Sequence, residues 1–357
     1  MFLREWLTWC WLYLQHTFIM MYWVTLPGLL AAAFLSLRYR ASLLGTMLKR
    51  QRGVGAGLSA IGLGLLDGDA GRAARLRTME NLSARGVSPS VALAYLLAGQ
   101  TFPLPVIGLF TVLLGLEFGL GLLLGGLAMI LLAAPGLPLL GLAASRQGEV
   151  GRASFTTPSE AAGEWSWARL LGSAGGWGAA VRWVARLFKG LWFPSVAGLI
   201  LGGVVLALDM HEVWILPAWL GNETWGTALA SAFLAPLLAT VAFVFPLGNL
   251  VVASSIWKTW TLAYSGVLSF ALAASFHPLT LRTLSARYGP GQTARLGLLL
   301  YLAACLGALA VPVALRILGL EVTHVPWFRD LVDRIMMGLP FTMLGTGGMP
   351  GGRMMSH

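Results

Sequence analysis

The chain has 357 residues, of which 57% are hydrophobic and only 11% are charged, and its formal net charge is +10. Because soluble domains contain about 25% charged residues, this composition predicts an integral membrane protein. An excess of Lys and Arg is typical of cytoplasmic loops, which set the orientation of membrane proteins. Nucleic acid is not an expected partner, since no zinc-finger spacing, aromatic RNA-binding motif or sustained basic helix occurs. We therefore expect a multi-pass protein of the cell inner (cytoplasmic) membrane, with the lipid bilayer as partner.

The first half opens with a Trp-rich segment, residues 1–16, that predicts an interfacial helix, because Trp and Tyr favour the headgroup level. Four apolar segments follow: 17–37, 54–66, 91–116 and 118–144. The first can span a membrane, with Pro27 as a kink, because a span needs about 20 apolar residues. The second has only 13 residues and is better explained by a re-entrant element.

The second half repeats this plan after a polar and then basic stretch. Its apolar runs are 191–208, 226–245, 261–277 and 296–318. An offset of 175 residues places 54–66 on 229–241 and 118–144 on 293–319. We therefore predict four regions: an N-terminal membrane repeat over 1–150, a cytoplasmic linker over 151–190, a C-terminal membrane repeat over 191–318, and an amphipathic then flexible tail over 319–357.

Charges beside the equivalent spans predict that the repeats are inverted. Basic residues follow the first span, namely Arg38, Arg40, Lys49, Arg50 and Arg52. In the second half, basic residues precede the equivalent span and acidic residues follow it: Arg182, Arg186 and Lys189, then Asp209 and Glu212. Since basic loops stay in the cytoplasm, the segments 38–52, 72–85 and 182–189 should share that side. Three residues conflict with this topology, which leaves them outside: Lys258, Arg329 and Arg334.

The predicted fold is thus an all-α polytopic membrane protein with two inverted repeats. Each repeat has about three spans plus one re-entrant element, and each contains a discontinuous helix. The helix breaks fall in LAGQTFPLPV at 97–106 and in LAASFHPLTL at 272–281, where Pro103 and Pro278 are separated by the 175-residue offset.

Breaking a helix in hydrocarbon leaves backbone groups without partners, which is tolerated only where protein or a wet cavity surrounds them. Matched broken helices in inverted halves point to a transporter's substrate site. The candidate pathway residues are Gln100, Thr101, Pro103, Ser275, His277 and Pro278. The alternative is that each proline merely kinks its helix and neighbouring groups satisfy the backbone.

His277 has two interpretations. A histidine inside a membrane suits a proton-coupled step, but it could equally bond a carbonyl freed by the break in its own helix. In the transport interpretation, Gln100 and His277 should approach each other across the pseudo-two-fold axis.

Polar residues at the ends of the short segments are candidates for an ion or proton site. They are Asp67 and Asp69 after the first segment and Asn249 in the second half. Alternatively, the two aspartates pair with basic residues, Arg72 or Arg75, at the cytoplasmic surface. Glu117 follows Leu-Gly-Leu and is expected in a loop at the outer face.

No feature of the sequence predicts an enzyme. Cys10 and Cys305 lie in apolar contexts and form neither a CxxC pair nor a disulfide framework. No catalytic triad, metal-ligand cluster or cofactor fingerprint occurs, so neither a metal nor a cofactor is expected.

The segment SARGVSPSVALAYLLAGQTFPLPVIGLFTVLLG resembles the first-half core of predicted permeases that include the ArsP-type organoarsenical exporters and the YraQ group. The matching order is Arg85-Gly86, an alanine-rich half-helix over 92–99, a break through Pro103, and Leu114-Gly115. The segment VLSFALAASFHPLTLRTLSARYG resembles the second-half motif, with Ala273-Ala274 and Pro278 in place. The resemblance covers roughly residues 20–145 and 190–318, and it implies a permease fold and efflux.

The chain departs from the family at two places. A Pro-x-Cys-x-Cys-like motif of the family is replaced by LLDGDAGRA, and Phe102 stands where the family has Asn. Trivalent arsenicals and soft metals prefer thiolates, so this divergent member is not expected to carry them.

Two functions therefore remain open. The first is a secondary transporter that moves a small solute or ion by alternating access around 98–103 and 273–278. The second is a non-transporting scaffold subunit that uses the permease fold within a larger membrane complex, with other membrane subunits as partners.

Overall fold

The structure, a computed structural model, describes residues 2–66, 72–134, 166–210, 218–222, 224–242, 247–259 and 261–320. Every regular element in these ranges is helical, which confirms the predicted all-α class. Five stretches are long and apolar enough to cross a membrane: Pro89–Leu114, Leu116–Ala133, Trp225–Ala242, Tyr264–Ala286 and Pro290–Ile317. Their number fits a multi-pass membrane protein.

The first half contributes six helices: α1 Phe2–Arg50, α2 Val54–Leu66, α3 Arg72–Ala84, α4 Pro89–Thr101, α5 Leu104–Leu114 and α6 Leu116–Ala133. The interfacial segment and the first span predicted from sequence are parts of one continuous helix, α1, with Pro27 inside it. The short apolar run at 54–66 is α2, with the predicted bounds.

The second half begins with α8 Trp167–Gly172 and α9 Ala174–Met210. The remaining elements are η2 Ala218–Gly221, α10 Trp225–Ala242, α11 Leu247–Lys258, α12 Tyr264–Leu272, η3 Ala273–Phe276, α13 Pro278–Tyr288 and α14 Pro290–Ile317. Helix α9 runs without interruption through position 190, where the sequence placed the boundary between linker and second repeat.

The two halves share a succession of elements. Helix α3 begins at Arg72 and α11 at Leu247, while α4 begins at Pro89 and α12 at Tyr264, so both pairs are 175 residues apart. The neighbours correspond as well: α2 packs on α4 as α10 packs on α12, and α5 packs on α6 as α13 packs on α14. The same arrangement of short helices therefore occurs twice.

The main core forms where the two halves meet. Helix α6 packs along α14, and α12 packs against both. The α6 and α14 backbones come close, since a Cβ added to Gly307 would lie 2.7 Å from the Gly125 carbonyl oxygen. This approach depends on small residues, as is common between membrane helices.

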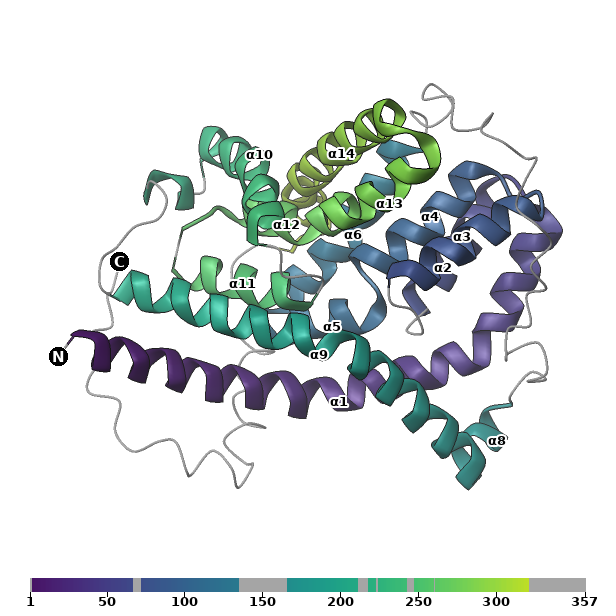
Figure 1. The fold of residues 1–357 in the computed structure, drawn as a ribbon, viewed down its shortest axis with the longest axis horizontal. Coiled ribbons are helices and arrows are strands. Elements are labelled where there is room, and N and C mark those ends of the chain that lie inside the picture. The colour runs from purple at the N-terminus through teal and green to yellow at the C-terminus, as the bar shows by residue number, and fades with distance from the viewer. Residues whose placement is uncertain are drawn as a thin grey trace.

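Helices α1 and α9 form the opposite side of the molecule (Figure 1). They pack against each other and run past one another in opposite directions. A second apolar cluster joins them to α8, with Ala33 and Phe34 of α1 packed near Leu170 of α8 and Trp183 and Leu187 of α9.

Candidate functional site

The first interruption separates α4 from α5. Helix α4 ends at Thr101, and Phe102 leaves the helix with φ −140° and ψ 48°, although its N–H still donates to the Ala98 carbonyl at 3.2 Å. Pro103 has no N–H, so the Gly99 carbonyl lacks its helical donor. The last turn of α4 therefore presents backbone acceptors that the helix itself does not satisfy.

Two polar side chains lie in this turn and are almost completely buried. Gln100 is 4% exposed and Thr101 is 2% exposed. Neither amide atom of Gln100, nor the Thr101 hydroxyl, has a hydrogen-bond partner within the part of the chain that the structure describes. Leaving a buried polar group unsatisfied costs roughly 1–3 kcal/mol. The end of α4 is thus a costly arrangement for folding alone.

The second interruption uses its polar groups differently. Helix α12 tightens into the 3₁₀ turn η3, and the Ser275 hydroxyl donates to the Leu272 carbonyl at 3.0 Å. His277, 1% exposed, caps α13 by accepting a hydrogen bond from the Leu279 N–H through Nδ1 at 3.2 Å. An imidazole nitrogen that accepts carries no proton. The histidine does bond its own broken helix, but to an N–H rather than to the expected carbonyl.

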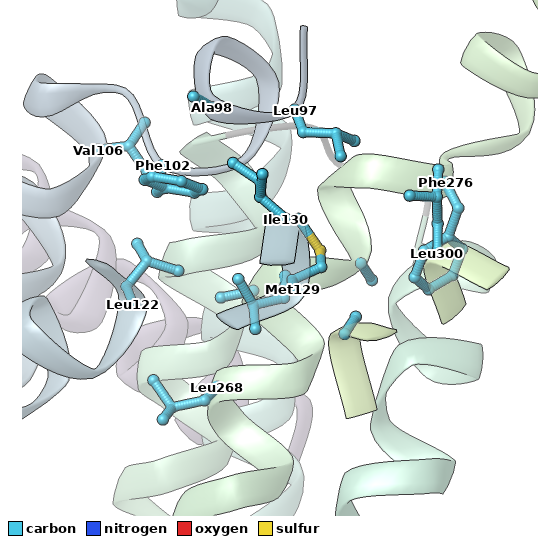
Figure 2. Close-up of a cluster of buried hydrophobic side chains, with 14 of the residues drawn as sticks. Leu97, Ala98, Phe102, Val106, Leu122, Met129, Ile130, Leu268, Phe276 and Leu300 are labelled. Atoms are coloured by element: carbon cyan, nitrogen blue, oxygen red, sulfur yellow. The ribbon is translucent and has the colours of Figure 1, made fainter. Parts of the chain in front are cut away.

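The two interruptions are close in space, since α4 contacts η3. Between them the core is apolar. In Figure 2, Met129 and Ile130 of α6 lie between Phe102 and Phe276, and all four are buried. The Phe102 ring lies against Gly126, and the Phe276 ring meets Tyr301 edge-on at 5.8 Å. The approach of Gln100 to His277 remains a prediction.

The candidate ion site is divided. Asp67 and Asp69 lie outside the described residues. Asn249 is in α11 and 1% exposed, and neither of its amide atoms has a hydrogen-bond partner among the described residues. Helix α11 packs on α9, α12 and α5, which places Asn249 on a buried helix of the second half.

Arg75 is a candidate that the sequence did not single out. It was considered only as a loop cation, yet it is 7% exposed. Its Nε lies 3.3 Å from the position of a Cβ added to Gly99, so the guanidinium stem packs on the last turn of α4. A cation is favourable at this end of a helix, where the macrodipole is negative.

The loop position expected for Glu117 is wrong. Glu117 is 3% exposed in the first turn of α6, where a carboxylate is favoured by the helix dipole. Its carbonyl accepts a hydrogen bond from the Tyr264 hydroxyl of the other half at 2.7 Å. The sequence signal was a lone acidic residue within an otherwise apolar stretch.

No protein-family model, curated protein or solved structure matches this chain. Among the described residues, no group of three His, Cys, Asp or Glu side chains is arranged to hold a metal ion.

Proposed function

We propose that the protein is a secondary transporter of the permease type, which moves a small solute or ion across the cytoplasmic membrane by alternating access at its two interrupted helices. The observation that carries the proposal is the matched pair of interruptions, with Gln100 and Thr101 buried without described partners at one of them. Paired discontinuous helices supply backbone groups and partial charges for a substrate or a coupling ion.

Several features support inverted repeats. The helix bounds repeat at one offset, and the equivalent helices α1 and α9 run in opposite directions in Figure 1. Helices α2 and α3 have 13 residues each, which makes them about 20 Å long. A hydrocarbon core is about 30 Å thick, so this length supports a re-entrant pair. The motif resemblance to permeases adds efflux as the direction.

One observation favours the second candidate, a scaffold subunit without transport. Phe102, Phe276, Met129 and Ile130 fill the region between the interruptions with apolar side chains. A scaffold needs such a core at all times, whereas a transporter needs it only in its occluded state. The two functions therefore differ in whether water ever reaches these positions.

Single cysteines distinguish the two functions. In a chain with Cys10 and Cys305 replaced by Ala, Gln100→Cys and Ser275→Cys are treated with a membrane-impermeant thiol reagent in right-side-out and in inside-out vesicles. A transporter exposes both positions to water from at least one side. Leu268→Cys, at a fully buried apolar position, is the matched control and should stay unlabelled. If all three cysteines are equally unreactive from both sides, transport is excluded and the scaffold function stands.

A further inference from the structure

The corner formed by α8 and the first half of α9 carries a surface that the proposed function does not use. One face of this corner is buried against α1, through Leu170, Ala180, Trp183 and Leu187. Two aromatic contacts hold it there: Phe34 and Trp177 meet edge-on at 5.0 Å, and Tyr39 and Trp167 do so at 6.2 Å. The remaining faces of α9 point away from the protein.

The corner itself is tightly constrained. The Ser173 hydroxyl donates to the Arg169 carbonyl at 2.6 Å and accepts from the Gly176 N–H at 3.0 Å. Trp177 Nε1–H donates to the Leu171 carbonyl at 3.0 Å. A Cβ at Gly176 would collide with the Leu170 backbone, so the two helices meet as closely as a glycine permits. The exposed side chains are therefore carried on a fixed frame.

Two stripes run along the exposed part of α9. The first is apolar and consists of Trp177, Val181, Phe188 and Trp192, each at least 41% exposed. The second is basic and consists of Arg182, Arg186 and Lys189, spaced i, i+4 and i+7, all exposed. At 100° per residue these stripes occupy adjacent faces. An aromatic stripe beside a basic stripe is the pattern of a helix at the membrane interface.

The basic charge has no acidic counterpart in the neighbouring sequence. The corner gathers six cations, Arg38, Arg40, Arg169, Arg182, Arg186 and Lys189. No Asp or Glu occurs between Glu5 and Asp67, or between Glu164 and Asp209. Arg186 Nε–H donates to the Arg182 carbonyl at 3.4 Å, which draws the two guanidinium-bearing side chains onto one face. Like charges at i and i+4 repel, so the arrangement favours a bound anion.

From this charge and shape we propose that the α8–α9 corner binds the headgroups of anionic phospholipids in the cytoplasmic leaflet. The phosphate sits over Arg182, Arg186 and Lys189, and the acyl chains lie along the apolar stripe. Long basic side chains reach outward to the headgroups while their stems stay in apolar surroundings. The inference does not depend on transport, because a scaffold subunit would carry the same surface.

The test measures lipid binding to the full chain in a neutral detergent, by native mass spectrometry, with phosphatidylglycerol and phosphatidylcholine of identical acyl chains. Each basic residue near an anionic surface contributes about 1 kcal/mol, or about fivefold in affinity. The double variant Arg182→Gln/Arg186→Gln should therefore bind phosphatidylglycerol roughly thirtyfold more weakly, with phosphatidylcholine binding unchanged. The charge-retaining variant Arg182→Lys/Arg186→Lys should keep the preference.

The matched control is Arg282→Gln/Arg295→Gln, which removes two exposed basic residues from α13 and α14. Its phosphatidylglycerol affinity should stay within about twofold of the unmodified chain, as expected for distant sites. Equal losses in both double variants would overturn the proposal, as would the absence of a phosphatidylglycerol preference in the unmodified chain. Displacement of the lipid by millimolar inorganic phosphate would assign the site to free anions instead and would also overturn it.

Discussion

Replacing Gly126 by Ala places a methyl group in space that the Phe102 ring occupies. The added Cβ would lie 2.9 Å from Phe102 Cγ and closer still to Cδ1 and Cε1. Carbon atoms in contact are normally about 3.5–4.0 Å apart, and Phe102 is fully buried. The ring must therefore move within a closed core, and overpacking of this kind costs about 1–3 kcal/mol.

A double-mutant cycle isolates this clash. In a Phe102→Ala background the space beside Gly126 is empty, so Gly126→Ala should stabilise the helix by roughly 0.5–1 kcal/mol through backbone entropy. The same substitution therefore changes sign between backgrounds, with a coupling energy of at least about 1.5 kcal/mol, in the range expected for contacting residues. Phe102→Ala alone should cost about 3–5 kcal/mol because it leaves a cavity.

The assay is equilibrium unfolding of the purified chain in mixed detergent micelles, with the free energy of unfolding as the readout. Gly108→Ala in α5 is the matched control, because no atom lies within 4 Å of its added Cβ, and it should stabilise the chain slightly. The reasoning is refuted if Gly126→Ala has the same effect as Gly108→Ala while Phe102 is present.

Three further outcomes are expected. Cysteines at Arg50 and Arg186 should escape impermeant reagents added from outside, and strong outside labelling at either position contradicts the inverted topology. Tyr264→Phe removes the hydroxyl that donates to a carbonyl in the first turn of α6 at 2.7 Å, so the free energy of unfolding should fall by about 1 kcal/mol; an unchanged value means that this link between the halves contributes nothing. His277→Leu removes the α13 cap and should cost about 0.5–2 kcal/mol, whereas His277→Asn, which keeps an acceptor, should cost less; equal losses in the two variants would rule out capping.

The sequence predicted those parts of the fold that depend on local chemistry. The helix ends at Thr101 and the restart at Pro278 follow from proline, which removes a backbone donor. The 13-residue run of α2 and the 175-residue offset could be read from apolar patterning alone. These features need no knowledge of which helices touch.

The parts that failed depend on tertiary contacts. Helix α11 is only 12 residues long, so a search for spans of about 20 apolar residues cannot find it, although its residues 250–256 are all buried. Arg75 and Glu117 are buried by helices that come from elsewhere in the chain. A single charge in sequence gives no sign of which neighbours will cover it, so both were assigned to loops.

Helix α1 has 49 residues in one unbroken element, which corresponds to a rod about 74 Å long. It contacts α2, α5 and α9 along its length, so these contacts act as a fulcrum. A tilt of about 5° of such a rod would move one end by roughly 6 Å relative to the other. A rearrangement too small to notice at the interrupted helices would therefore be amplified at the N-terminus, where a single fluorophore could record it.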